Sequence, residues 1–197
     1  MASTDIARRP RGRPRSFDVE QALAQAETLF HEHGYDGVSV ATIAEALRIN
    51  PPSFYAAFGS KAELFARILE RYARSALPIE SVLRAGRPVG EALAELLEAA
   101  ARIYSANPAA QGCLVVESTR DGGCEVRAAA RCYRDAARAR IEAFVAISAP
   151  AQAGQIADFV ELMLSGLSAG AREGRDTDRL VASARTAALA IPAVLEG

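Results

Sequence analysis

The chain has 197 residues and a formal net charge of −1, and 50% of its residues are hydrophobic but only 6% aromatic. A chain of this length and hydrophobic content can bury a proper core, which excludes wholesale disorder. No stretch approaches the roughly 18 uninterrupted apolar residues of a membrane span, and the charged amino end lacks the apolar run of a secretory signal. We therefore expect a soluble, cytoplasmic protein.

The first 17 residues contain a concentrated basic stretch, RRPRGRPRSF, at residues 8–17. They carry five arginines against Asp5 alone, although the whole chain is close to neutral. The rest of the chain must therefore be mildly acidic. A localised basic arm on such a body indicates contact with a polyanion at one place.

Two helices are predicted directly after the arm. Over residues 18–33, apolar residues recur at three- and four-residue steps, and Gly34 suits the end of this amphipathic helix. Ser39 is a predicted N-cap for a short second helix that runs to about Leu47, because its hydroxyl can accept a bond from a free backbone N–H.

A third short helix is predicted to end at Phe58. Asn50 is a suitable N-cap for it, and Pro51 fits the first helical position, where its missing N–H costs nothing. Ser60 and Glu63 form the capping box of a fourth helix. The second and third helices are short and separated by about four residues, so they predict a helix-turn-helix, in which one helix braces and the next enters a DNA major groove.

The local sequence strengthens this prediction. The segment SVATIAEALRINPPSFYAAFGSKAELFARIL, residues 39–69, resembles the DNA-binding domain of the TetR (AcrR-type) family of one-component bacterial regulators. The features that carry the resemblance are Thr42-Ile43-Ala44, Phe54-Tyr55 with Phe58, Ser60-Lys61, and Phe30 followed by Gly34-Tyr35 at the end of the first helix. The resemblance covers about residues 16–70, and the later helices match the family only in number and length.

The resemblance implies a role for each matching position. Thr42 would bind a phosphate from the start of the second helix, and Lys61 would meet another beside the exposed N–H groups of the fourth. The groove-facing residues of the third helix would be Asn50, Pro51, Ser53, Tyr55 and Ala56, with the Tyr55 hydroxyl bonding the DNA backbone. Packing of Tyr55 against Phe58, and a solvated surface lysine at position 61, are the alternatives.

Alanine at positions 56 and 57 leaves the third helix poor in base-reading groups, because a methyl group can contact only a thymine methyl. The arm could compensate. Pro10-Arg11-Gly12-Arg13-Pro14 resembles an AT-hook core, in which glycine lets the backbone lie deep in a narrow minor groove and arginines follow its floor. We expect Arg11, Arg13 and Arg15 to contact DNA. The alternative is an unstructured basic tail that gives salt-sensitive, sequence-blind attraction.

The remaining chain is also predicted to be helical. Breaks at proline and glycine separate five further helices, and no segment alternates as a strand would. We expect an all-α fold of about nine helices with three parts: a basic flexible arm (1–15), a helix-turn-helix domain (16–60), and a helical effector-binding and dimerisation domain (61–197). The five later helices are predicted at about 89–105, 110–120, 125–147, 151–172 and 177–195.

The last two helices correspond to the pair with which the resembled family forms dimers. An apolar stripe on the first of them, with two glycines four residues apart, predicts a two-fold interface between subunits. The expected interface residues are Phe159, Met163, Gly166, Leu167 and Gly170.

The stretch from Gly166 to Gly170 also fits the G-x-S-x-G elbow of hydrolases, with Ser168 in the nucleophile position. That elbow needs a preceding strand and a later histidine. A helical stripe precedes Ser168, and no histidine follows it. We therefore expect helix packing, no catalytic residue and no enzyme activity.

The three cysteines, Cys113, Cys124 and Cys132, are odd in number and lack CxxC spacing, which argues against a disulfide framework, a structural zinc site or another metal site. Gly112-Cys113-Leu114 resembles a recurrent motif of one branch of the family. Cys113 would line the ligand pocket or sense oxidants and electrophiles; the alternative is a small buried hydrophobe. No cofactor is expected.

Four arginines recur at three- and four-residue steps on the helix predicted at 125–147, opposite an apolar face. We expect a solvated outer face rather than a second DNA-binding surface. These residues are Arg127, Arg131, Arg134 and Arg138.

Taken together, the residues and the resemblance predict a transcriptional repressor. It would bind a palindromic operator in double-stranded DNA as a homodimer and leave it when a small-molecule effector enters the pocket. Two alternatives stay open: a thiol-based redox- or electrophile-responsive regulator that uses Cys113, and a helical adapter that does not bind DNA.

Overall fold

The computed structural model describes residues 18–196, and throughout that range the regular secondary structure is helical. None of the described helices combines the length and hydropathy that a membrane span requires. The all-α prediction is confirmed. The helices are α1 (Val19–Gly37), α2 (Val40–Ala46), α3 (Pro51–Phe58), α4 (Lys61–Ser75), α5 (Ile79–Val82), α6 (Val89–Ser105), α7 (Leu114–Ser118), α8 (Cys124–Ala146), α9 (Ala153–Arg172), α10 (Thr177–Ala188) and α11 (Ala190–Glu196).

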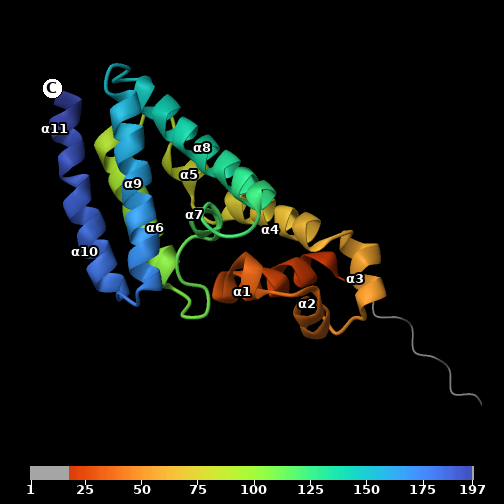
Figure 1. Cartoon of the computed structure of the whole chain (residues 1–197). Helices are drawn as coiled ribbons and strands as arrows, with labels where there is room; N and C mark the ends of the chain where they lie inside the picture. The colour runs from red at the N-terminus through yellow and green to blue at the C-terminus, as the bar shows by residue number, and fades with distance from the viewer. Residues whose placement is uncertain (1–17, 197) are drawn as a thin grey trace, which may run out of the picture.

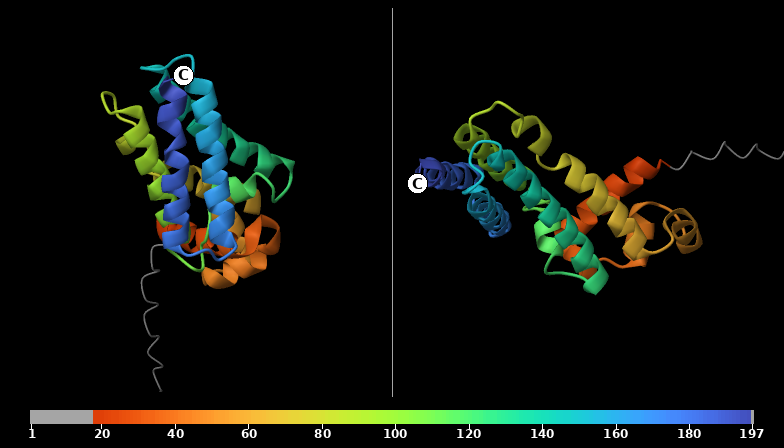
Figure 2. Two further views of the ribbon diagram at one scale, coloured as in Figure 1. Left: turned by 90° about the vertical axis from the view of Figure 1, so that its left-hand side faces the viewer. Right: turned by 90° about the horizontal axis from the view of Figure 1, so that it is seen from above.

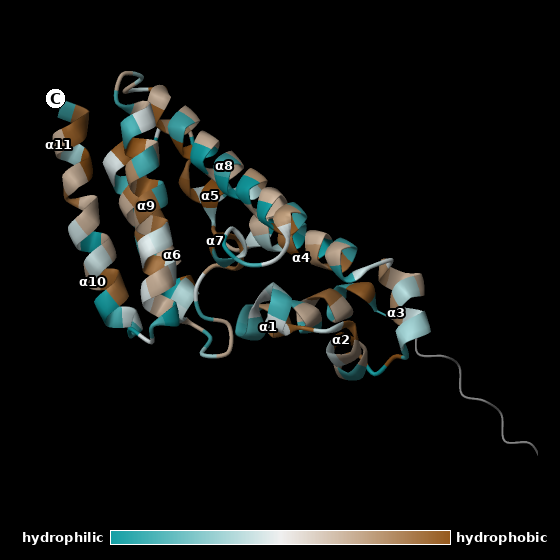
Figure 3. Ribbon diagram, in the orientation of Figure 1, coloured by the Kyte–Doolittle hydropathy of each residue, from teal (hydrophilic) through white to brown (hydrophobic). Residues whose placement is uncertain are grey.

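The helices form two packed groups that are joined through α4, α7 and α8. Helices α1, α2 and α3 gather at one end of the molecule, whereas α6, α9 and α10 pack together at the other, with α4 and α8 between them (Figure 1). The short helix α7 contacts α1, α4 and α8, so it lies where the two groups meet. Most helices carry both hydrophilic and hydrophobic residues along their length, as amphipathic helices do (Figure 3).

One continuous apolar core runs through both groups. In the first group, the Phe65 ring of α4 meets the Phe30 ring of α1 edge-on at 4.7 Å between centroids, and it meets Tyr35 at 5.0 Å. In the second group, the central helix α6 buries Leu93, Leu96 and other apolar side chains completely. Helix α4 packs against α1 of the first group and against α8, which packs against α9 of the second, so it connects the two parts of the core.

The structure differs from the sequence prediction most clearly at α7, at α10 and α11, and at α5. The helix expected at 110–120 is shortened to α7 because Gly112 has a φ of +83° and Cys113 is extended. The helix expected at 177–195 is divided at Leu189 into α10 and α11. Pro192 lacks an N–H, and its ring clashes with the carbonyl four residues earlier, which interrupts a continuous helix there. The four-residue helix α5 was not predicted.

Candidate functional site

Hydroxyl and amide side chains cap the amino ends of the three helices α2, α3 and α4. The Ser39 Oγ accepts a hydrogen bond from the Thr42 N–H at 3.0 Å, and the Asn50 Oδ1 accepts one from the Ser53 N–H at 2.8 Å. The Ser60 Oγ accepts a bond from the Glu63 N–H at 3.1 Å. These caps fix the directions in which α2, α3 and α4 leave their turns.

Helix α3 has one buried and one exposed face. Phe54 and Phe58 lie in the core, whereas the predicted groove-facing residues are exposed. The Tyr55 side chain is 53% exposed and packs edge-on against Phe54. Its hydroxyl has no hydrogen-bond partner among the described residues. The exposed face comprises Asn50, Pro51, Ser53, Tyr55, Ala56 and Ala57.

The two predicted phosphate contacts differ in their surroundings. Thr42 is exposed near the start of α2, where its Oγ1 lies 2.8 Å from the Ser39 Oγ. Lys61 lies at the first position of α4 with its Nζ 4.1 Å from the centroid of the Tyr35 ring, so it is held by a cation–π contact rather than fully solvated. Arg11, Arg13 and Arg15 lie outside the described residues.

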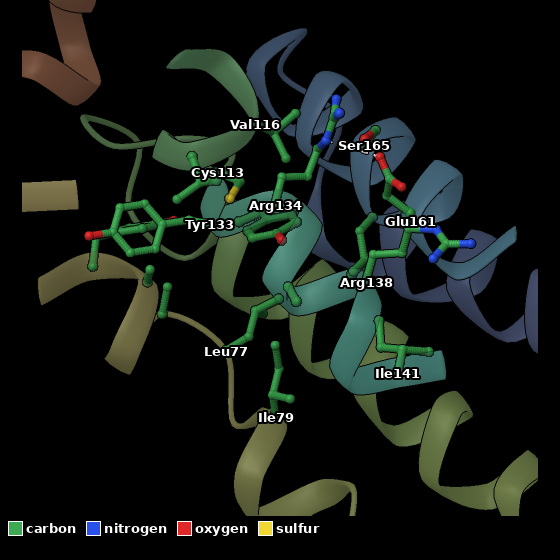
Figure 4. A pocket seen from close by; sticks show the side chains of 17 residues that line it. Leu77, Ile79, Cys113, Val116, Tyr133, Arg134, Arg138, Ile141, Glu161 and Ser165 are labelled. Carbon is green, nitrogen blue, oxygen red and sulfur yellow. Dashed lines mark ion pairs between the residues drawn. The ribbon is translucent and has the colours of Figure 1, made fainter. Parts of the chain in front are cut away.

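A pocket lies between α4, α7, α8 and α9 (Figure 4). The empty space in the pocket and in the open solvent at its mouth amounts to about 610 Å³, and most of the pocket wall is apolar. Cys113 lies at the wall together with the side chains of Tyr72 and Tyr104. Burial raises the pKa of the Cys113 thiol, and it also raises the pKa values of Tyr72 and Tyr104. All three groups are therefore protonated and neutral at pH 7.

Charged residues of α8 and α9 line another part of this pocket. The Arg134 Nε lies 3.2 Å from a Glu161 carboxylate oxygen, and the Arg138 guanidinium lies 2.6 Å from both Asp158 and Glu142. Arg134 and Arg138 were expected on a solvated outer face, and that expectation is wrong for these two. Their ion pairs with neighbouring carboxylates draw them over the pocket wall, while Arg131 remains exposed.

Sequence reasoning missed a chain of polar contacts at the junction of the two helix groups. The buried Ser168 Oγ accepts a hydrogen bond from the Cys113 N–H at 2.9 Å and donates one to the Glu117 carboxylate at 2.9 Å. The Arg172 guanidinium lies 3.7 Å from Glu117 and donates a hydrogen bond to the His31 carbonyl at 3.2 Å. The serine of the G-x-S-x-G pattern thus links the pocket wall to α1. The one available signal for these contacts was the position of Ser168, a polar residue that is buried within a helix.

Two further groups lie at this junction. The Asp121 carboxylate accepts a hydrogen bond from the Tyr35 N–H at 2.7 Å, just after the kink that Gly34 makes in α1. The His31 ring is buried, and its Nδ1 has no hydrogen-bond partner. Burial, reinforced by the positive charge of Arg172, lowers the pKa of His31 to about 4.

Helices α9 and α10 lie side by side on one outer face of the molecule (Figure 2). Of the predicted interface residues, Phe159, Met163 and Gly166 are at least partly exposed there, together with Leu162, which is 65% exposed. Leu167 and Gly170 are buried within the subunit. A Cβ on Gly170 would come within 2.9 Å of a Leu180 methyl of α10, so its close helix approach is made inside one chain.

The described residues show neither a metal-binding cluster nor a disulfide. Residues 18–196 contain no group of three or more His, Cys, Asp or Glu side chains that could hold a metal ion. Cys124 and Cys132 are exposed free thiols, and Cys113 is a buried one.

Known proteins resemble this chain along nearly its whole length. The family model for bacterial regulatory proteins of the tetR family matches residues 22–68. The HTH-type transcriptional repressor BdcR of Escherichia coli (strain K12) is 47% identical over 94% of each chain, and the repressor ComR of the same organism is 29% identical over 93% of each. A solved cysteine mutant of the TetR family regulator CifR, in complex with 26-bp double-strand operator DNA, is 34% identical, with a TM-score of 0.79, over 90% of this chain and 99% of that one.

Proposed function

The chain belongs to the TetR family of bacterial regulators, and from this we propose that it represses transcription by binding a palindromic operator as a homodimer. It is a regulator and not an enzyme. The observation that carries the proposal is the outer face of α3: its side chains are exposed, and the Tyr55 hydroxyl has no partner within the described chain. A polar group of this kind gains a partner when DNA is bound.

We assign the DNA contacts to the exposed positions around α3. Thr42, Tyr55 and Lys61 would bind phosphates, and the cation–π contact with Tyr35 would hold the Lys61 ammonium beside the N–H groups that begin α4. Asn50, Pro51, Ser53 and Ala56 would face the bases, and the arginines of the arm, Arg11, Arg13 and Arg15, would add contacts outside the major groove.

The pocket would bind the effector. Its wall is mainly apolar, and the polar groups at Cys113 are two neutral phenols and a neutral thiol. The arginines that line the other part of the pocket, Arg134 and Arg138, are already paired with neighbouring carboxylates. This combination suits a small, mainly apolar molecule without a net charge that carries one hydrogen-bonding group. Direct thiol sensing is less well supported, because burial raises the pKa of Cys113 and so keeps it in the unreactive thiol form.

The junction contacts supply a route from the pocket to DNA. An effector that displaces Cys113 would shift its backbone N–H, which donates a hydrogen bond to Ser168. The same serine donates a hydrogen bond to Glu117 and so holds this carboxylate beside Arg172. Arg172 in turn bonds α1 of the helix-turn-helix group. The effector would release DNA by the difference between its affinities for the DNA-bound and DNA-free conformations.

Footprinting on DNA upstream of the protein's own gene and neighbouring genes tests this function. We expect a protected palindrome. Tyr55→Phe should weaken binding about tenfold or more, through loss of a hydrogen bond to a charged phosphate. The control is Tyr133→Phe, at a residue of α8 that lines the pocket, and it should bind fully. If no DNA segment is bound in preference to others, the repressor proposal is wrong and the adapter alternative takes its place.

A further inference from the structure

Arg48 stands out in the turn between α2 and α3. It has a φ of +55°, and every other positive φ in residues 18–196 belongs to a glycine. Its N–H bonds the Glu45 carbonyl at 3.0 Å, and the Ile49 N–H bonds the Ala44 carbonyl at 3.0 Å. These bonds end α2 with its last carbonyls satisfied, at a position where glycine is the usual residue because it lacks a Cβ.

No contact within the described chain compensates for this strain. The Arg48 side chain is exposed and has no hydrogen-bond or ion-pair partner among residues 18–196. Glycine would make the same turn more favourably, so folding alone does not account for arginine here. A strained backbone at an exposed turn indicates a role for the side chain that it carries.

Charge gives that role a direction. Arg48 is the one cationic residue between Ser39 and Ser60, the segment that forms the helix-turn-helix. It lies two residues before Asn50, the N-cap of α3, and therefore beside the end of the recognition helix that approaches the bases first. A guanidinium at this place can bind one phosphate through two parallel N–H bonds.

We propose that Arg48 is a DNA-contacting residue that binds an operator phosphate at the edge of the major groove and orients α3 in it. This inference rests on the proposed repressor function. The turn adopts a less favourable backbone conformation at Arg48. In return, it places a positive charge on the surface of the helix-turn-helix, which otherwise carries almost none.

Two substitutions separate charge from strain. Arg48→Gln removes the charge and keeps the strained backbone, whereas Arg48→Gly removes both. Arg84→Gln is the matched control, because Arg84 is an exposed arginine in the loop after α5 without a side-chain partner among the described residues. Operator binding is measured by fluorescence anisotropy from 50 to 200 mM salt, and stability by thermal unfolding.

Both Arg48 variants should bind the operator about tenfold or more weakly at low salt, since each loses a charged hydrogen bond. For a dimer with two such contacts, the slope of log affinity against log salt should become shallower by about 2. Arg48→Gly should also raise the melting temperature by about 2–4 °C, while Arg84→Gln changes neither quantity.

The outcomes distinguish the two proposals. If the unaltered protein binds no operator, the repressor function itself fails. If it binds and both Arg48 variants bind equally well, the contact is refuted. Weaker binding with an unchanged salt slope would also refute a phosphate contact and would assign Arg48 to the bases instead.

Discussion

His31 is a residue whose environment opposes its charged form. The ring is buried against Tyr72, with 5.3 Å between ring centroids, and the Arg172 guanidinium bonds the carbonyl of the same residue. Both burial and the nearby positive charge disfavour the imidazolium, which is why the pKa of His31 falls from 6.5 to about 4. His33, two residues later, is exposed.

This difference predicts a pH dependence of stability. Between pH 6.5 and 4 the unfolded chain binds a proton at His31 that the folded chain does not, so stability is lost as the pH falls through this window. The loss amounts to about 3 kcal/mol for a pKa shift of this size. Urea unfolding at several pH values should show His31→Gln losing less stability than the unaltered protein, by about that amount. His33→Gln should behave as the unaltered protein does, and a parallel loss in all three proteins would contradict the assignment.

The sequence foretold some residues of the site but not their long-range partners. The caps Ser39, Asn50 and Ser60 were predictable because a cap bonds an N–H two or three residues away, within the same local pattern. The surroundings of His31 include Arg172, which bonds its carbonyl from 141 residues away in the chain. No local pattern contains such a contact.

At the scale of helices, contacts between distant parts of the chain again explain why α7 and α9 differ from the sequence prediction. The composition of residues 110–120 favours a helix, but Gly112 turns the chain with a positive φ so that it passes over α9, where a Cβ would come within 2.8 Å of Arg172. On α9 the apolar stripe was predicted correctly as apolar. It could not reveal that Leu167 and Gly170 are buried within their own chain while Phe159 and Met163 stay partly exposed, because burial inside a subunit and burial between subunits select the same residue types.

The contact between α7 and α9 yields a second prediction. In Ser168→Ala, the Cys113 N–H would lose its acceptor and the Glu117 carboxylate would lose a donor, while the protein interior loses only one oxygen atom. An unsatisfied buried N–H costs about 1–3 kcal/mol. Urea unfolding should show a loss of this size, whereas Ser165→Ala on the same helix, whose hydroxyl lines the pocket, should stay within about 0.5 kcal/mol of the unaltered protein. Equal stability of the two variants would mean that this contact is not part of the fold.

At the scale of the whole molecule, the outer face of α9 and α10 would decide whether two recognition helices act together. Leu162→Glu places a charge on this face, where a dimer would bury it. We expect sedimentation to show monomers and operator affinity to fall by about a hundredfold or more, because the second half-site is no longer bound from an effective concentration set by the dimer. Ile147→Glu, at an equally exposed aliphatic residue at the end of α8, should leave the dimer intact. A dimeric Leu162→Glu protein would remove this face from the proposed interface.

The basic arm must act on the same scale, since a dimer brings two arms to one operator. Deleting residues 1–15 removes five arginines from each subunit, so operator binding should weaken, and its salt slope should become shallower by up to about 0.9 for each arginine that contacts a phosphate. One further measurement separates an arm that only tethers the protein to DNA, without regard to sequence, from an arm that reads the minor groove. If Arg11, Arg13 and Arg15 follow a narrow minor groove, replacing A·T pairs that flank the palindrome by G·C pairs should weaken binding of the full chain but not of the truncated one. If both proteins respond equally to this replacement, the arm acts as a tether. If truncation changes neither affinity nor salt slope, the arm does not contact the operator, and the proposed compensation for Ala56 and Ala57 fails with it.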